Sequence, residues 1–197
     1  MARPRLLIVG GGRMGEALLG GLLSTGWAQA SELAVSEKLS HVRAALADRH
    51  PGVAVGPAPV DADGAVLAVK PDDAEAACRQ VAEVGLVQLL SIVTGVPIER
   101  IESWLGGGAA VVRAVPNTPA LVGAGATAIA GGHRAGEPEL SWAEHVLGSV
   151  GRVVRVPEHL LDAVTGLSGS GPAYVYLLVE ALVEAGVLNG LTWDLSR

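Results

Sequence analysis

Phenylalanine is absent from the 197-residue chain, and aromatic residues make up only 3% of it. The core must therefore be built from small and aliphatic side chains, which suits close packing of helices on a sheet. Cys78 is the single cysteine, so an internal disulfide framework and a multi-cysteine metal site are both excluded. We expect Cys78 to fill core space in a helix.

Charged residues are scarce as well, at 17%, and the formal net charge is −6. The sequence has no long basic run, which argues against a nucleic-acid partner, because such binding depends on Lys and Arg contacts to phosphates. The most membrane-like stretch, 174–191, carries Glu180 and Glu184, which argue against a transmembrane helix. The apolar run 6–9 is too short for a signal peptide. We therefore expect a cytoplasmic protein with no membrane partner.

Several catalytic signatures are missing too. The sequence has no G-x-x-x-x-G-K-S/T, no H-E-x-x-H and no G-x-S-x-G motif. Its five histidines show no metal-ligand spacing, so we predict no metal site.

Strand-like apolar runs alternate with helix-like segments through about residue 156. The run 65–69 is apolar throughout, as expected of a strand buried on both faces. This alternation predicts a parallel, doubly wound α/β sheet. The predicted strands are 6–9, 33–35, 53–55, 65–69, 87–93, 110–115, 126–130 and 153–156, and the predicted helices are 16–23, 41–46, 71–81, 97–105 and 137–147.

The C-terminal segment differs from the rest. Residues 160–165 and 173–187 are typical of helices, and a Gly-Ser-rich turn is expected between them. We place the domain boundary near Pro157, with an α/β domain at 1–156 and a helical domain at 157–197.

The six residues after the first predicted strand satisfy G-x-G-x-x-G. In this motif Gly10 permits a tight turn, Gly12 lets the backbone approach a pyrophosphate, and Gly15 lets the helix pack closely on the sheet. The helix N-terminus adds free N–H groups and a positive dipole end. A glycine-rich turn without a ligand is the alternative, because a chain with 27 glycines meets the pattern easily by chance. The position between a strand and a helix favours a dinucleotide.

Three polar residues end the second predicted strand, where the adenosine ribose of a dinucleotide would lie. Glu37 stands about twenty positions after the glycines, where an acidic residue binds the ribose 2′-OH and favours NAD. Ser36 and Lys38 suit a 2′-phosphate and favour NADP. The plainer alternative is a solvated strand end, and the sequence leaves the cofactor preference open.

Three further segments place polar groups or glycines at the ends of elements. Lys70 follows the strand 65–69 directly, either as a snorkelling surface group or as a cation of the site. Asn117 lies between two prolines that stiffen its loop, so its carboxamide is a candidate for orienting a nicotinamide; an ordinary Pro-Asn turn is the alternative. Residues 167–174 are either a flexible helix connection or a backbone that approaches a ligand closely.

Four segments together resemble the pyrroline-5-carboxylate reductase family. They are G-G-G-R-M-G at 10–15, A-V-K-P at 68–71, R-A-V-P-N-T-P-A at 113–120 and D-A-V-T-G-L-S-G-S-G-P-A-Y at 162–174. Their order and spacing agree along the chain, and the last two motifs are long and specific. Val115 stands where the family usually has Met. The resemblance implies a Rossmann domain, followed by the start of an all-helical dimerisation domain.

The resemblance also implies the reaction and its binding residues. NADPH, with NADH as an alternative, would give hydride to the C=N carbon of a small cyclic imine, 1-pyrroline-5-carboxylate, yielding L-proline. No catalytic acid is predicted, because an iminium already accepts hydride well and positioning can supply most of the acceleration. The residues implied at the cofactor are Val9, Gly10, Gly11, Gly12, Arg13, Met14, Gly15, Ser36, Glu37, Ala68, Val69, Lys70, Pro71, Ile92, Val93, Thr94 and Asn117. Those implied beside the substrate are Ser168, Gly169, Ser170 and Gly171.

Family members continue beyond the last motif with a Ser-Pro-Gly-Gly-x-Thr loop for the substrate carboxylate and with helices that complete an intertwined dimer. We therefore expect a C-terminally truncated chain, with the apolar helix 173–187 exposed and prone to self-association. In the full-length family form a homodimer or higher homo-oligomer is implied. Two alternatives stay open: a truncated fragment that binds nucleotide without catalysis, and a related imine or β-hydroxyacid reductase.

Overall fold

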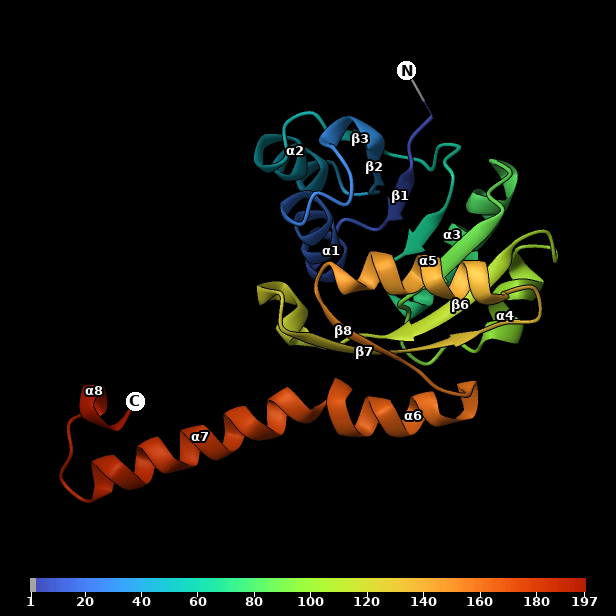
Figure 1. The fold of residues 1–197 in the computed structure, drawn as a ribbon. Coiled ribbons are helices and arrows are strands. Elements are labelled where there is room, and N and C mark those ends of the chain that lie inside the picture. The colour runs from blue at the N-terminus through green and yellow to red at the C-terminus, as the bar shows by residue number, and fades with distance from the viewer. Residues whose placement is uncertain (1–2) are drawn as a thin grey trace.

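The computed structural model describes residues 3–197 and contains an eight-stranded sheet with helices on both faces (Figure 1). The strands are β1 (Leu6–Val9), β2 (Leu33–Ser36), β3 (Ala54–Gly56), β4 (Ala65–Leu67), β5 (Gln88–Ser91), β6 (Ala110–Val115), β7 (Gly125–Gly131) and β8 (Gly151–Arg155). The α-helices are α1 (Arg13–Ser24), α2 (Ser40–Arg49), α3 (Ala74–Glu83), α4 (Ile98–Trp104), α5 (Glu137–Gly148), α6 (Leu161–Val164), α7 (Gly171–Leu188) and α8 (Trp193–Ser196). Short 3-10 turns are η1 (Ala30–Glu32), η2 (Pro71–Asp73), η3 (Thr118–Val122) and η4 (Glu158–Leu160).

The strand order is β3-β2-β1-β4-β5-β6-β7-β8, and neighbouring strands from β3 to β6 pair in parallel. The chain adds strands outward on one side of β1 and then crosses to the other side, so β1 and β4 form a topological switch point. Ligands of open α/β sheets bind beyond the carboxyl ends of the strands at such a point. The fold therefore directs attention to the segments that follow β1, β2 and β4.

The predicted doubly wound sheet is confirmed for its first six strands, but its last two strands run the other way. β7 pairs antiparallel with β6, and β8 pairs parallel with β7. Only residues 116–124 connect β6 to β7, and they hold the short turn η3 in place of a full helix. A parallel neighbour needs a longer crossover connection, so this short link returns the chain in the opposite direction.

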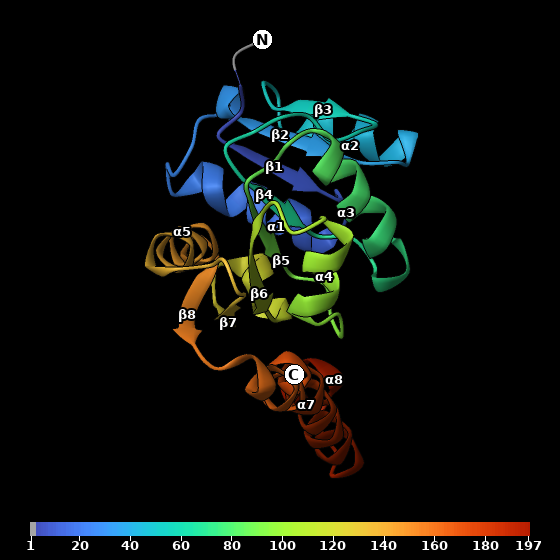
Figure 2. The same ribbon diagram turned by 90° about the vertical axis from the view of Figure 1, so that its right-hand side faces the viewer.

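Two cores of small and aliphatic side chains cover the faces of the sheet. Figure 2 shows α3 and α4 on one side of it and α5 on the other. Helices α1, α2 and α5 bury Leu18, Leu22, Leu46 and Leu147 against one face. On the opposite face Cys78 of α3 is fully buried, as predicted, and burial raises the pKa of its thiol to about 12. The thiol therefore stays protonated and acts as core packing.

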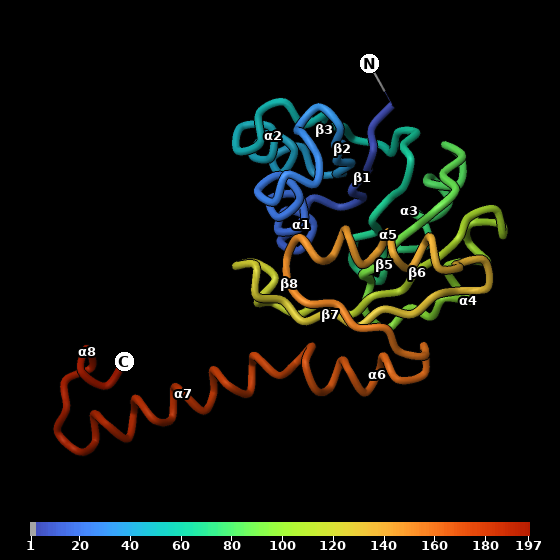
Figure 3. The backbone as a smooth tube through the Cα atoms, in the orientation of Figure 1, coloured from blue at the N-terminus to red at the C-terminus, as the bar shows by residue number. Residues whose placement is uncertain are grey.

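The C-terminal segment forms a helical arm that leaves the sheet (Figure 3). A turn was expected between its two helices, but a π-helical stretch, η5 (Thr165–Gly169), continues directly from α6, and the single residue Ser170 separates it from α7. Pro172 is compatible with this path because it lies in the first turn of α7, where a missing N–H costs little. The arm is long and apolar enough to cross a membrane by length and composition alone, a test that the core helix of a soluble protein also passes.

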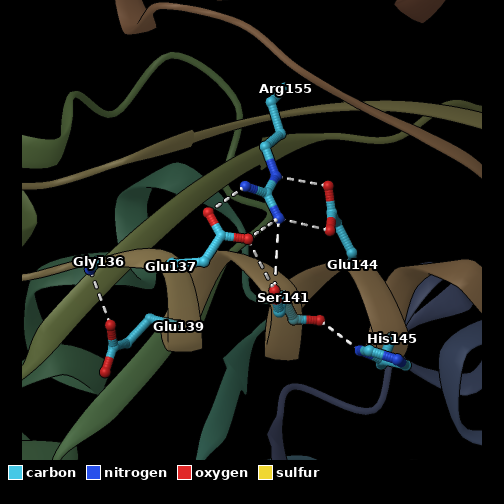
Figure 4. A network of polar contacts seen from close by, with 7 residues as sticks. All are labelled: Gly136, Glu137, Glu139, Ser141, Glu144, His145 and Arg155. Carbon is cyan, nitrogen blue, oxygen red and sulfur yellow. Dashed lines mark hydrogen bonds and ion pairs between the residues drawn. The ribbon is translucent and has the colours of Figure 1, made fainter.

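An ion-pair network ties the edge strand β8 to α5 (Figure 4). Nη1 of Arg155 lies 2.6 Å from Glu137 Oε2, and its Nε lies 2.6 Å from Glu144 Oε1. Hydrogen bonds from this guanidinium lower the pKa of both carboxyls. The network thereby restrains a strand that has a neighbour on one side only.

We predict that Arg155→Gln lowers the melting temperature at pH 7 and that the loss shrinks in acid. A carboxyl whose pKa is lowered by folding contributes stability above its unfolded pKa and loses it as the pH falls through the folded pKa. The difference from the parent protein should therefore fade below the ordinary carboxyl value of 4.5. Thermal unfolding followed by circular dichroism between pH 3 and pH 7 measures this. Arg152→Gln, on the same strand, is the control, because Arg152 has no ion pair among residues 3–197. If Arg155→Gln lowered the melting temperature by the same amount at pH 3 and at pH 7, the prediction would be contradicted.

Candidate dinucleotide-binding site

A cavity of about 360 Å³ lies beyond the carboxyl ends of β1, β2 and β4. It is placed at the topological switch point, where the fold predicts a ligand. A larger and more open hollow of about 800 Å³ lies along the outer side of α1, away from these strand ends. The smaller cavity is the candidate site because it combines the strand ends with the glycine turn. Its predicted members are Val9, Gly10, Gly12, Ser36, Glu37, Ala68, Val69 and Lys70.

The glycines that follow β1 have the geometry that the motif predicts. Gly10 has a φ of 103°, and a Cβ there would lie 2.6 Å from the Ala68 carbonyl oxygen. A Cβ on Gly15 would collide with the Gly10 carbonyl oxygen, so only glycine lets α1 approach β1 this closely. At Gly12 a Cβ would meet nothing within 4 Å. That open side is the space through which a ligand would approach the backbone.

Backbone amides at the start of α1 are available to an anion. The bond from Glu16 N to Gly12 O is the first of the helix, so the amides of Arg13, Met14 and Gly15 precede the intrahelical ladder. Such amides, together with the helix dipole, make an anion site. The amide of Gly11 is instead engaged, because it donates to Glu37 Oε2 at 2.9 Å. The side chain of Arg13 lines the larger hollow, outside the candidate cavity.

Charged and polar groups gather at the β2 end of the cavity. The carboxylate of Glu37 also accepts from Leu39 N at 2.8 Å, so both of its oxygens hold backbone amides. Lys38 Nζ lies 2.6 Å from Asp73 Oδ1, which joins the end of β2 to η2. The hydroxyl of Ser36 is buried and has no hydrogen-bond partner in the described part of the chain. A ligand polar group would satisfy it.

Other predicted site residues lie outside this cavity. Val93 is buried in the core, and Ile92 packs on the opposite core. Thr94 is exposed beyond β5, and Pro71 begins η2. Asn117 is buried, and its carboxamide is engaged with the backbone of Ala126 and Ser168. Residues 168–171 are half-buried.

The cavity also has walls that the sequence patterns did not identify. Asp73 is one of them, because the sequence predicted only the start of a helix in its segment and no role in a site. Pro57 and Pro59 follow the edge strand β3. The rule that ligands lie beyond strand ends, applied to β3, would have indicated both prolines. The remaining lining residues from α2 and α3 and the β2 loop are Leu39, Val42, Ala76, Ala77 and Gln80. Among residues 3–197, no three His, Cys, Asp or Glu side chains group as a metal site would require.

Comparisons with known proteins connect both ends of this architecture to characterised families. A family model described as pyrroline-5-carboxylate reductase dimerisation matches residues 158–197, and one described as NADP oxidoreductase coenzyme F420-dependent matches residues 5–95. The pyrroline-5-carboxylate reductase of Mycobacterium leprae is 43% identical over 197 residues, covering 95% of this chain and 67% of the relative. That of Synechocystis is 41% identical over 192 residues, covering 95% and 71%.

Solved structures agree with the sequence relatives. A pyrroline-5-carboxylate reductase from Coxiella burnetii superposes with a TM-score of 0.90 at 31% identity, covering 98% of this chain and 74% of the other. A Plasmodium falciparum pyrroline carboxylate reductase with NADP bound gives a TM-score of 0.84 at 28% identity, covering 100% and 74%.

We predict that Gly12→Ala weakens NADPH binding about tenfold or more, which is ~1.4 kcal/mol, while the protein stays folded. Gly12 has φ −71° and ψ −175°, which alanine adopts freely, and the added methyl group meets no protein atom within 4 Å. It would project instead into the space open to a pyrophosphate. Quenching or enhancement of NADPH fluorescence measures the binding. Gly20→Ala on the same helix, where a Cβ also meets nothing, is the control and should bind as the parent does. If Gly12→Ala bound NADPH as well as the parent protein does, the assigned approach of the pyrophosphate to the Gly12 backbone would be contradicted.

Proposed function

Because the chain belongs to the pyrroline-5-carboxylate reductase family, an NADP-dependent oxidoreductase family of proline biosynthesis, we propose that residues 10–15, 36–38 and 68–70 hold NADPH. We further propose that residues 168–171 face 1-pyrroline-5-carboxylate, whose C=N bond is reduced to give L-proline. The observation that carries the proposal is the glycine turn at the switch point, where Gly12 leaves the helix start open and Gly15 lets the helix approach β1.

Three segments of the chain would each hold a different part of the cofactor. The amides that begin α1 would hold the pyrophosphate, and the hydroxyl of Ser36 together with Lys38 would lie at the adenosine ribose. The β4 extension, Ala68 to Lys70, would line the path toward the nicotinamide. NADPH supplies the hydride when bound. The residues of this chain orient the two reactants and exclude water, which is the positioning that an iminium acceptor needs most.

We also propose the assembly that the helical arm serves. The proposed domains are a dinucleotide-binding domain at 1–156 and a dimerisation and substrate domain at 157–197. Apolar side chains of α7, such as Leu177, Leu178 and Leu182, are 60–67% exposed. An apolar surface of this kind is typical of a protein interface, and the matched family model is one of dimerisation. The protein would act as a cytoplasmic homodimer in which the arms of two copies cover one another.

The activity is tested by mixing the purified protein with NADPH and 1-pyrroline-5-carboxylate and following the absorbance of the reduced nicotinamide. We expect oxidation that depends on the imine and saturates with it. Binding of NADPH without oxidation would support the alternative of a nucleotide-binding chain without turnover. An open-chain imine and a β-keto acid, the oxidised form of a β-hydroxyacid, are offered with NADPH in parallel to test the related reductases. Faster turnover of either would contradict the assigned substrate.

We predict that Glu37→Gln shifts the cofactor preference toward NADPH by about fivefold, close to 1 kcal/mol for one charge at a partly screened site. The carboxylate faces the region proposed for the 2′-phosphate, and removing its charge removes a repulsion that NADH does not feel. Lys38→Met should shift the preference the opposite way, because it removes the positive partner. The ratio of kcat/KM for NADPH to that for NADH measures both. A ratio that moves in the same direction in the two variants would contradict this assignment of charges.

A further inference from the structure

Asn117 joins the end of β6 to the helical arm through its side chain. Its Nδ2 donates to the Ser168 carbonyl oxygen at 3.1 Å, and its Oδ1 accepts from Ala126 N at 2.9 Å. The two partners fix the orientation of the carboxamide, because a backbone carbonyl only accepts and a backbone amide only donates. Asn117 is 8% exposed, so its own side chain is largely shielded from water, and the contact with Ser168 is partly buried.

The Ser168 carbonyl is free for this contact because of the sequence of the arm. In an α-helix this carbonyl would accept from the amide of residue 172, four positions on. Residue 172 is proline and has no amide hydrogen. The next amide, that of Ala173, donates to Ser170 O. The π-helical stretch and Pro172 thus leave one carbonyl without a helical donor, and Asn117 supplies the donor from another part of the fold.

The contact lies where the arm meets the sheet. Asn117 follows β6 at the carboxyl edge that also holds the dinucleotide cavity, and a Cβ on Gly169 would lie 3.7 Å from Val115 Cγ1 of β6. Beyond this point α7 runs away from the sheet (Figure 1). Residues 168–171 are therefore tied to the end of β6 at this point.

We propose that Asn117 is a positioning residue, which holds the 168–171 segment against the end of β6 and so sets the distance between the substrate side and the cofactor side of the site. This inference rests on the proposed function, in which that segment faces the imine. The Asn117 loop would thus align the two reactants. Its carboxamide would do so through hydrogen bonds to the protein backbone and not through contact with the cofactor. Alignment of this kind is sensitive to displacements of about 1 Å.

Asn117→Asp tests the link with little change of shape. The aspartate keeps an acceptor for Ala126 N but places a second oxygen against the Ser168 carbonyl, so the donor is lost. We expect KM for the imine to rise about tenfold, with the Kd for NADPH within twofold of the parent value. Lowering the pH should recover part of the loss in Asn117→Asp but none in Asn117→Ala, because a protonated carboxyl regains an O–H donor. Both variants are compared with the parent protein at each pH, which cancels the titration of the substrate.

A second variant approaches the contact from the arm. Pro172→Ala leaves Asn117 intact and gives the Ser168 carbonyl a competing helical donor, so KM for the imine should rise about threefold. Hydrogen exchange supplies a readout that needs no turnover: the peptide spanning 165–175 should exchange faster in Asn117→Asp, and the peptide spanning 10–20 should not. An unchanged exchange rate at 165–175 would overturn the inference even in a protein without turnover. The inference would also be overturned if Asn117→Asp lost affinity for the imine and for NADPH equally, or if lowering the pH did not restore part of its KM for the imine. Absence of turnover in the parent protein bears on the proposed function alone.

Discussion

The close approach of α1 to β1 is the constraint on which the site depends. It exists because Gly15 presents no side chain to the Gly10 carbonyl, and because Gly10 adopts a φ that other residues avoid. The helix start is thereby brought to the switch point, next to Gly10 and Gly12, which line the cavity. Further along α1, Gly21 makes the same kind of approach to Ser149 and Val150, so the helix is fitted closely at both ends. A core without phenylalanine suits this closeness, because small side chains allow short distances between helix and sheet.

Charge at the β2 end of the cavity is balanced within the protein. Glu37 is held by the amides of Gly11 and Leu39, and Lys38 is paired with Asp73. The pair of Lys38 and Asp73 is largely exposed, so exchanging one anionic partner for another costs little. Glu37, by contrast, has its carboxylate fixed beside the glycine turn. Under the proposed function, the cofactor preference would depend on how the fixed negative charge of Glu37 and the exposed positive charge of Lys38 share this region.

The sequence predicted most of the elements and the glycine turn between β1 and α1, because both depend on local pattern. Strand β6 was predicted with its observed bounds, and β4 was predicted two residues too long because Ala68 and Val69 are as apolar as the strand itself. The reversal at β7 was missed, since strand direction depends on the length of a connection and not on composition. The π-helical stretch was taken for a turn, because Gly and Ser are typical of turns. Contacts of Asn117 and Asp73 join segments far apart in the sequence, and no local pattern contains them.

Strand β6 carries the connection between the sheet and the arm. Its Arg113, with a side chain 5% exposed, lies 3.2 Å from Glu158 and 3.4 Å from Asp162. A buried guanidinium requires such partners, because an unpaired charge in the interior is strongly unfavourable. Asn117 adds a second, uncharged link at Ser168, about three helical turns beyond Glu158. Leu161 of α6 is fully buried in the core of the sheet and anchors the base of the arm, whereas Val183 is the one buried residue of α7 among residues 3–197. Apolar packing at Leu161 and polar contacts from strand β6 therefore act together at the base of the arm. Under the proposed function, this junction would set how the substrate side and the cofactor side of the site meet.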